Sequence, residues 1–190
     1  MSQQRIPDLF GGEERELGSS DPQRDAGHDE MEHPAEGTEN GFKKICLVCT
    51  HGGHLTEMLH LMDSFDRHDV FFLTTESMRT RHLDHRKYLI KNVKRTNPLS
   101  FLVAAFRIAD VYQKEKPDLV VSMGAGVAVP AVAMARLMGI HTIFVESLCR
   151  VRTLSPAGRV VLPLANVFLV QWQDLLGQLP RKAQYWGRIV

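Results

Sequence analysis

Short, uninterrupted apolar runs alternate with segments of helical periodicity through most of this chain. The clearest runs are residues 45–50, 70–74, 118–122 and 141–145. They lack the regular polar positions of a strand with one solvated face, so each run predicts a strand buried on both faces. Buried strands that alternate with helices form a parallel sheet covered on both sides. We therefore predict an α/β fold with a doubly wound, Rossmann-like parallel sheet.

The segments between these runs predict the helices that cover the sheet. Apolar residues recur at helical spacing in residues 55–65 and 98–116, and residues 127–138 are mostly apolar. The second of these helices begins with Asn97 as a predicted cap and a proline at its first position. Its apolar stripe, the pattern by which a helix packs on a core, consists of Leu99, Leu102, Val103, Phe106 and Val111.

The remaining segments predict shorter elements. Further strands are predicted at residues 88–93, which should lie at an edge, and at residues 166–170 and 183–186. Short helices are predicted at residues 155–161 and 174–179.

Charge divides the chain into two parts. The first 40 residues carry eleven acidic and three basic side chains, a net charge of −8, whereas residues 41–190 carry a net charge of +9. The acidic segment has few large apolar residues, so it buries too little surface to offset its ordering entropy. We predict a disordered acidic tail, residues 1–41, followed by one folded domain, residues 42–190.

The cysteines and the longest apolar stretch bear on where the protein works. Cys46 and Cys49 are three residues apart on a predicted strand, so their side chains point to opposite faces, which argues against a shared metal. An odd number of cysteines in apolar surroundings suits a reducing compartment, and we expect the cytoplasm. Residues 119–135 are uncharged, but two glycines and a proline interrupt them, so we interpret them as a strand, a turn and a helix rather than a membrane span.

Unusual residues follow three of the predicted strands, at positions 51–54, 122–126 and 146–152. The carboxyl ends of parallel strands share one edge of the sheet, and ligands of such folds bind there. We therefore expect these three segments to converge on one crevice.

Two of these segments are glycine turns that lead into a helix. Glycines let the backbone approach a ligand closely, and the free N–H groups of a helix N-terminus suit phosphate. Close packing of strand against helix is the alternative explanation for such turns. We predict that phosphate is bound by Gly52, Gly53, Thr56, Gly124, Ala125 and Gly126.

His54 lies at the start of the first predicted helix. A neutral imidazole there can accept a proton from an attacking hydroxyl, and the positive end of the helix favours the neutral form. We predict His54 as a general base, with a capping or packing role as the alternative. His51 and His54, or His82 and His85, lack a convincing third and fourth ligand, so no metal site is predicted.

Glu146 directly follows a predicted strand and precedes a segment with two arginines. Its carboxylate can orient a sugar hydroxyl, assist proton removal, or pair with an arginine. Arg150 and Arg152 suit a diphosphate because guanidinium groups bind phosphate oxygens in a fork. We predict Glu146 as a second catalytic candidate, with Ser147, Arg150 and Arg152 binding phosphate. A salt-bridged surface cluster is the alternative.

Four motifs stand in an order and spacing that resembles a known family. They are HGGHLTEML at 51–59, SMGAGVAVP at 122–130, VESLCRV at 145–151 and YWGRIV at 185–190. The chain resembles the acceptor-binding subunit of the two-subunit UDP-N-acetylglucosamine transferase of lipid-linked oligosaccharide synthesis. It is similar as well to prokaryotic relatives in exopolysaccharide and capsule synthesis. The resemblance covers about residues 43–190 and implies the amino-terminal half of a GT-B glycosyltransferase.

The resemblance implies a hexosyltransferase subunit. Such a subunit helps to move N-acetylglucosamine or another hexose derivative from a UDP-sugar co-substrate to a lipid-diphosphate-linked sugar. It implies a donor-binding partner subunit, activity only in the heteromer, and no cofactor. By the same likeness His54 matches the position of the base and Glu146 that of a strand-end acidic residue.

The eukaryotic members begin with a membrane-spanning segment, where this chain has its acidic tail. We therefore expect peripheral binding on the cytoplasmic face of a membrane, with the basic residues between Arg79 and Arg95 near anionic lipid. No nucleic-acid recognition module is visible, so no nucleic acid is expected. The alternatives are a membrane scaffold and a non-catalytic nucleotide-binding domain; the missing G-x-G-x-x-G motif counts against the latter.

Overall fold

The computed structural model describes residues 43–93, 97–180 and 182–189. The predicted tail, residues 1–41, lies outside the described residues.

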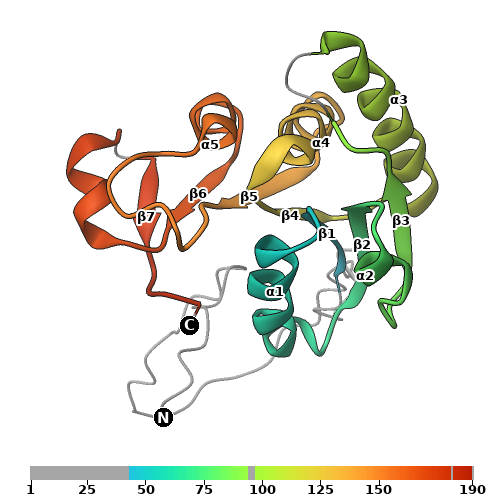
Figure 1. The fold of residues 1–190 in the computed structure, drawn as a ribbon, viewed down its shortest axis with the longest axis horizontal. Coiled ribbons are helices and arrows are strands. Elements are labelled where there is room, and N and C mark those ends of the chain that lie inside the picture. The colour runs from blue at the N-terminus through green and yellow to red at the C-terminus, as the bar shows by residue number, and fades with distance from the viewer. Residues whose placement is uncertain (1–42, 94–96, 181, 190) are drawn as a thin grey trace, which may run out of the picture. The chain divides into compact units, whose positions relative to one another are not determined.

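A seven-stranded parallel sheet forms the centre of the fold (Figure 1). The strands lie in the order β3-β2-β1-β4-β5-β6-β7, and every neighbouring pair is parallel. The predicted Rossmann-like sheet is therefore confirmed, including an edge position for the third strand. The strands are β1 (Lys44–Cys49), β2 (Asp69–Thr75), β3 (Lys87–Ile90), β4 (Leu119–Met123), β5 (His141–Val145), β6 (Val167–Val170) and β7 (Ala183–Tyr185).

Helices cover both faces of the sheet (Figure 1). α1 (Gly53–His60) lies on one face, whereas α3 (Pro98–Glu115), α4 (Ala125–Leu137) and α5 (Pro156–Val161) lie side by side on the other. The short helix α2 (Met78–Arg81) and the 3-10 helices η1 (Met62–Phe65) and η2 (Gln173–Gln178) complete the connections. In the described part of the chain, no helix combines the length and the apolar character needed to cross a bilayer.

The core lies mainly between the sheet and the helices α3, α4 and α5. Side chains of β1, β2 and β4 pack there against Ile108 and Tyr112 of α3 and Val127 of α4. Phe144 of β5 and Phe168 of β6 stack with ring centroids 5.0 Å apart in a second cluster with α4 and α5. The strands are thus buried on both faces, as their continuous apolar sequences predict.

The first predicted helix is shorter than its apolar spacing indicates. α1 ends at His60, and η1 follows it. The backbone tightens there to bonds between residues three apart: Leu61 N donates to Met58 O at 3.1 Å, and Ser64 N to Leu61 O at 3.0 Å. Apolar residues three and four apart fit both geometries, so the periodicity did not reveal the break.

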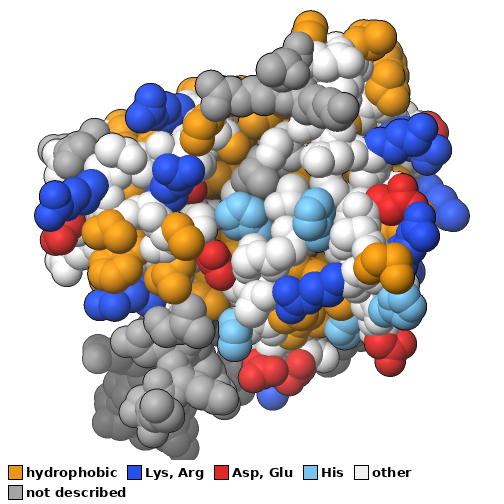
Figure 2. Space-filling model, viewed as in Figure 1, with side chains coloured by type: hydrophobic (Ala, Val, Ile, Leu, Met, Phe, Trp, Pro, Cys, Tyr) orange, Lys and Arg blue, Asp and Glu red, His pale blue; other side chains and the backbone are white. Residues whose placement is uncertain are grey.

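The interpretation of the stripe on α3 as a packing face is wrong for four of its five residues. Leu99, Leu102, Val103 and Phe106 are exposed, Phe106 by 68%. The helix instead buries Ala104, Ile108, Val111 and Tyr112. Figure 2 shows hydrophobic side chains gathered over the amino-terminal half of α3. We call Leu99, Leu102, Val103 and Phe106 the α3 apolar stripe.

Candidate functional site

The strands β1, β4 and β5 end in one row at the carboxyl edge of the sheet. Cys49 pairs with Met123, and Met123 with Val145, so the three segments that follow begin side by side. The chain leaves β1 toward α1 on one face and β4 toward α4 on the other. This is the point where the strand order reverses, at which open α/β sheets bind their ligands. The predicted convergence of the three segments is confirmed.

Two helix N-termini open at this edge without a side-chain cap. Gly52, with φ 89°, precedes α1, and Gly124, with φ 54°, precedes α4. Both φ values lie in the left-handed region that favours glycine. Neither helix has an acidic residue in its first turn. The first N–H groups of both helices therefore face a region suited to an anion.

His54, in the first turn of α1, packs against the backbone of Gly124. A Cβ built on Gly124 would lie 2.4 Å from Cε1 of the imidazole. The buried Nδ1 atom has no hydrogen-bond partner within the part of the chain that the structure describes. The ring is thus held by packing at the junction of the two helix N-termini, and its nitrogen is not committed to the protein.

Burial lowers the pKa of His54 below its usual value of 6.5. The carboxylates of Glu57 and Glu146 oppose this shift, and the guanidinium of Arg150 adds to the lowering. The lowered pKa keeps the imidazole neutral at physiological pH, which is the form that accepts a proton.

Glu146 follows β5 and is 1% exposed. Its Oε2 accepts hydrogen bonds from the backbone N–H of Ser155 at 2.9 Å and from its hydroxyl at 3.0 Å, and its Oε1 accepts from Ser147 N at 3.0 Å. Gly158 gives this carboxylate room, because a Cβ there would lie 2.2 Å from Oε2. The carboxylate therefore anchors the start of α5 to the end of β5.

The other predicted residues of this segment differ in their surroundings. Ser147 is buried, and its hydroxyl donates to Glu57 Oε1 at 3.0 Å. Arg150 is exposed but close enough to His54 to influence its pKa. Arg152 is exposed and forms no ion pair or hydrogen bond with the residues described, and its role in binding phosphate stays a prediction.

Thr56 and the second turn have contacts within the protein. The Thr56 hydroxyl donates to Gly52 O at 3.3 Å and accepts from Arg79 Nη1 at 3.0 Å. Gly126 approaches the loop after β3, where a Cβ would lie 3.1 Å from Val93 O, so close packing accounts for this glycine. Gly53 and Ala125 are the first residues of their helices.

Three residues that shape this edge were not predicted to belong to the site. Arg79 of α2 reaches the glycine turn before α1, with Nη1 3.4 Å from Gly52 O. Glu57 and Gln171 are buried and hydrogen-bonded to each other at 3.0 Å. The one sequence feature that could have indicated a role for Glu57 was its position beside the apolar residues of a predicted helix. Gln171 follows a predicted strand, and no sequence feature indicated a role for it.

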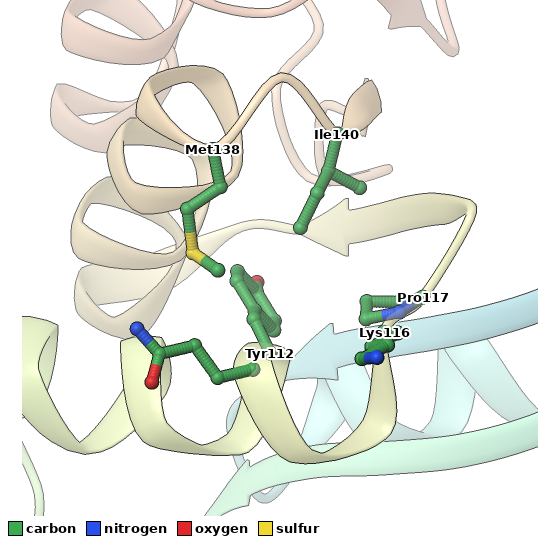
Figure 3. A pocket seen from close by; sticks show the side chains of 6 residues that line it. Tyr112, Lys116, Pro117, Met138 and Ile140 are labelled. Carbon is green, nitrogen blue, oxygen red and sulfur yellow. The ribbon is translucent and has the colours of Figure 1, made fainter.

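A hollow lies at the opposite edge of the sheet (Figure 3). It measures ≈ 340 Å³ between the ends of α3 and α4, and Tyr112, Met138 and Ile140 line it with Gln113, Lys116 and Pro117. Pro117 and Ile140 precede β4 and β5, so this hollow faces the amino ends of the strands and is separate from the candidate site. Among the described residues, no group of His, Cys, Asp and Glu is arranged to hold a metal ion.

Comparison with known proteins places the chain in a family. Residues 45–189 match the family described as "Oligosaccharide biosynthesis protein Alg14 like". The chain belongs to the Alg14-like family. The human protein named "UDP-N-acetylglucosamine transferase subunit ALG14" is 33% identical, over 77% of this chain and 82% of its own length. The protein of the same name from Yarrowia lipolytica is 29% identical, over 77% of this chain and 81% of its own.

Solved structures confirm the GT-B-type, Rossmann-like fold of this Alg14-like chain. MurG of Acinetobacter baumannii superposes with a TM-score of 0.65 at 22% identity, over 75% of this chain and 45% of that protein. UDP-N-acetylglucosamine 2-epimerase of Rickettsia bellii gives a TM-score of 0.61 at 17% identity, over 77% of this chain and 45% of that one. The chain spans less than half the length of these two proteins. At identities this low, the likeness supports a conclusion about the fold only.

Proposed function

We propose that this Alg14-like chain is the acceptor-binding subunit of a glycosyltransferase. The complex transfers a sugar, N-acetylglucosamine or a related hexose derivative, from a UDP-sugar to a lipid-diphosphate-linked sugar. The observation that carries the proposal is the position of His54 between the N-termini of α1 and α4 at the switch point of the sheet. The name of the human relative, a UDP-N-acetylglucosamine transferase subunit, supports the choice of reaction.

His54 acts as the general base in this proposal. A neutral imidazole takes the proton from the acceptor hydroxyl as the hydroxyl attacks the anomeric carbon of the donor sugar. The lowered pKa and the uncommitted Nδ1 support this role. Glu146 assists by holding the segment that carries Ser147 and Arg150, because its oxygens are already engaged by Ser147 and Ser155.

The acceptor diphosphate binds where the chain offers N–H groups and positive charge. The N-termini of α1 and α4, with the turns at Gly52, Gly53 and Gly124, supply the N–H groups. Arg150 supplies a guanidinium from the facing segment. Fixing the diphosphate there orients the acceptor hydroxyl, which is the main way such a site lowers the barrier.

The donor sugar requires a partner subunit. The name of the human relative, a transferase subunit, supports this. We expect the UDP-sugar to be held largely by that partner across the carboxyl edge of the sheet.

We further propose that the protein binds peripherally at the cytoplasmic face of a membrane, and the α3 apolar stripe supports the contact with lipid. Large apolar side chains gain about 1.5–3 kcal/mol each when fully removed from water, so four on one helix face favour insertion at a lipid surface. The basic stretch contributes less than the sequence indicates. Arg81 pairs with Glu76 and Arg86 with Asp69, both at 2.6 Å, while Lys94 and Arg95 lie outside the described residues.

Transfer by the purified complex tests the catalytic proposal. The complex is isolated through a tag on this chain from the cells that make it, then given UDP-N-acetylglucosamine and a short-chain lipid diphosphate carrying N-acetylglucosamine. We expect transfer by the complex, none by this chain alone, and a loss of about 10²–10⁴-fold in kcat with His54→Gln. Full activity of the partner alone would contradict the subunit assignment, and unchanged kcat of the variant would remove only the base.

Sedimentation with vesicles of phosphatidylcholine and phosphatidylserine tests the membrane proposal. We expect Leu102→Glu combined with Phe106→Glu to abolish cosedimentation. Leu137→Glu, at a residue of α4 that is 79% exposed, is the matched control and should bind like the parent. Equal binding by the α3 variant and the parent would argue against the stripe as the lipid contact.

A further inference from the structure

The carboxylate of Glu57 joins three parts of the protein. Glu57 lies on α1, three residues after His54, and is 9% exposed. Its Oε1 accepts from the Ser147 hydroxyl at 3.0 Å, and its Oε2 accepts from Leu148 N at 3.1 Å and from Gln171 Nε2 at 3.0 Å. The helix that carries His54 is thereby tied to the segment after β5 and to the residue after β6.

Gln171 holds this carboxylate with an amide that has only one suitable orientation. The side chain is 2% exposed. Its Nε2 donates to Glu57 Oε2 and to Glu146 O, both at 3.0 Å, while its Oε1 accepts from Ile189 N at 3.1 Å. Turning the amide over would place its oxygen against a carboxylate and a carbonyl.

The next residue, Trp172, connects the same segments. Its Nε1 donates to Leu148 O at 2.6 Å, and the guanidinium of Arg188 lies 4.4 Å from the centre of its ring. Gln171 and Trp172 thus both link residues 187–189 to residues 146–148. The segment after β5 is held from α1 on one side and from the carboxy-terminal residues on the other.

Stability alone does not account for an acidic residue at position 57. Within the described residues neither Glu57 nor Glu146 forms a salt bridge, and their hydrogen-bond donors are neutral. Burying a carboxylate without a cation beside it costs free energy that its hydrogen bonds must offset. What the carboxylate does provide is a fixed separation between α1 and the segment after β5.

We propose that Glu57 is a positioning residue of the transfer site and that Gln171 holds its carboxylate in place. Glu57 sets the position of His54 on α1 relative to Ser147 and Arg150. This inference rests on the proposed function, since it concerns the base and the acceptor-binding segment of the same site. Neither residue needs to touch the substrate.

Three variants and one control test the proposal in the tagged complex. The variants are Glu57→Gln, Gln171→Met and the two combined. The control is Thr142→Val, because Thr142 is fully buried and exchanges hydrogen bonds of 2.9 and 3.0 Å with Asn166 at the amino edge of the sheet. It removes comparable bonds far from the candidate site.

With UDP-N-acetylglucosamine and the lipid diphosphate acceptor, we expect each single variant to lose about 10- to 100-fold in kcat while KM for the donor changes less than about threefold. Both residues act through one contact, so their effects should not add. The kcat of the double variant should therefore be no lower than that of the less active single variant. Thr142→Val should keep its kcat. An active parent with unchanged kcat in both single variants would overturn the positioning role.

The pH profile separates positioning of the base from general weakening of the fold. Glu57, Glu146 and Arg150 are the charged groups that act on His54. Burial and Arg150 lower the pKa of His54, and the Glu57 charge raises it. In Glu57→Gln the pKa of His54 should therefore be lower, and the acid limb of kcat/KM should move to lower pH. It should stay in place in Thr142→Val.

Hydrogen exchange tests the network without activity. In Gln171→Met, peptides covering residues 146–150 and 187–189 should exchange faster than in the parent, whereas β1 should exchange at the parent rate. Unchanged exchange in both peptides would overturn the positioning role whether or not the complex is active. A parent complex that transfers no sugar but shows the expected exchange would instead count against the proposed function.

Discussion

The imidazole of His54 occupies the space that a side chain on Gly124 would need. A Cβ at Gly124 would lie 2.4 Å from Cε1 and 2.8 Å from each ring nitrogen of His54. His54 belongs to the helix after β1 and Gly124 to the turn after β4, so the contact joins the two segments that diverge at the switch point. Because Gly124 has no side chain, the imidazole of His54, the proposed base, can lie against the turn after β4.

Substitution of Gly124 by alanine should therefore displace His54. We expect Gly124→Ala to lower kcat of the complex by about 100-fold, since small misplacements of a reacting group have effects of that size. The residue also has φ 54° and ψ −179°, a conformation that essentially only glycine adopts, so the variant should lose about 1–3 kcal/mol in its free energy of unfolding. Transfer assays and urea denaturation measure the two effects.

Gly139 provides the matched control for this substitution. Its φ is 75°, also in the left-handed region, but a Cβ there would meet nothing within 4 Å. Gly139→Ala should lose stability through its positive φ alone and leave kcat unchanged. If the two variants were equally active, contact with Gly124 would not be what places His54.

The lowered pKa of His54 makes both stability and transfer depend on pH. Below its usual pKa of 6.5, the unfolded chain protonates this histidine while the folded chain keeps it neutral. The unfolded state then binds more protons, so the free energy of unfolding decreases as the pH falls from 6.5 through the lower folded pKa. In His54→Gln, denaturation curves between about pH 5 and 8 should lack this part of the decrease. An identical pH dependence in the parent and the variant would contradict the shift.

Local sequence patterns were sufficient to predict most of the fold. Continuous apolar runs identify the strands because strands of a covered parallel sheet are buried on both faces. The cap at Asn97 is confirmed, since its side chain accepts from Leu99 N at 3.0 Å and Pro98 begins the helix. The position of His54 and Gly124 at neighbouring strand ends followed from the same rule for parallel sheets.

Periodicity could not say which apolar face of α3 is buried. Leu99, Leu102, Val103 and Phe106 have helical spacing, but so do Ala104, Ile108, Val111 and Tyr112. Both sets contain four residues, so helical spacing alone does not choose between them; the position of α4 and the sheet selects the second.

Contacts between segments far apart in the chain could not be predicted from the sequence either. Glu57 and Gln171 are 114 residues apart, and neither pattern nor spacing predicts that one binds the other. The direction of the Glu146 carboxylate, toward Ser155 instead of an arginine, depends on where α5 begins.

Glu146 should behave as a positioning group rather than as the base. Glu146→Ala leaves the N–H of Ser147 and both donors of Ser155 without their acceptor, so we expect a loss of about 2–4 kcal/mol in the free energy of unfolding. Glu146→Gln keeps one acceptor oxygen and should retain kcat within about tenfold. A loss of more than about 10³-fold with this variant would identify Glu146 as the base instead.

Gly158→Ala disturbs the same carboxylate without replacing it. The new Cβ would lie 2.2 Å from Glu146 Oε2, so the start of α5 must shift and thermal unfolding should occur at lower temperature. Gly177→Ala is the control, because a Cβ there meets nothing within 4 Å. Equal melting temperatures for the two variants would mean that Gly158 does not serve to accommodate Glu146.

The three cysteines should react very differently with thiol reagents. Cys46 and Cys49 are buried and Cys149 is exposed. Burial raises the pKa of Cys46, and it raises the pKa of Cys49 to about 12. The fraction of reactive thiolate at these two strand residues is therefore very small. Ellman's reagent should therefore titrate one thiol rapidly in the folded protein and three after denaturation in guanidinium chloride.

Labelling of Cys149 also tests the segment after β5 as part of the site. Cys149 lies between Leu148, whose N–H donates to Glu57, and Arg150, which acts on the pKa of His54. The attached aromatic carboxylate would bring bulk and negative charge to the proposed diphosphate site, so modification should slow transfer by the complex at least about tenfold. A Cys149→Ser complex should be active and insensitive to the reagent. Because the two buried thiols remain unmodified, full activity of the labelled complex would show that the acceptor does not bind beside this segment.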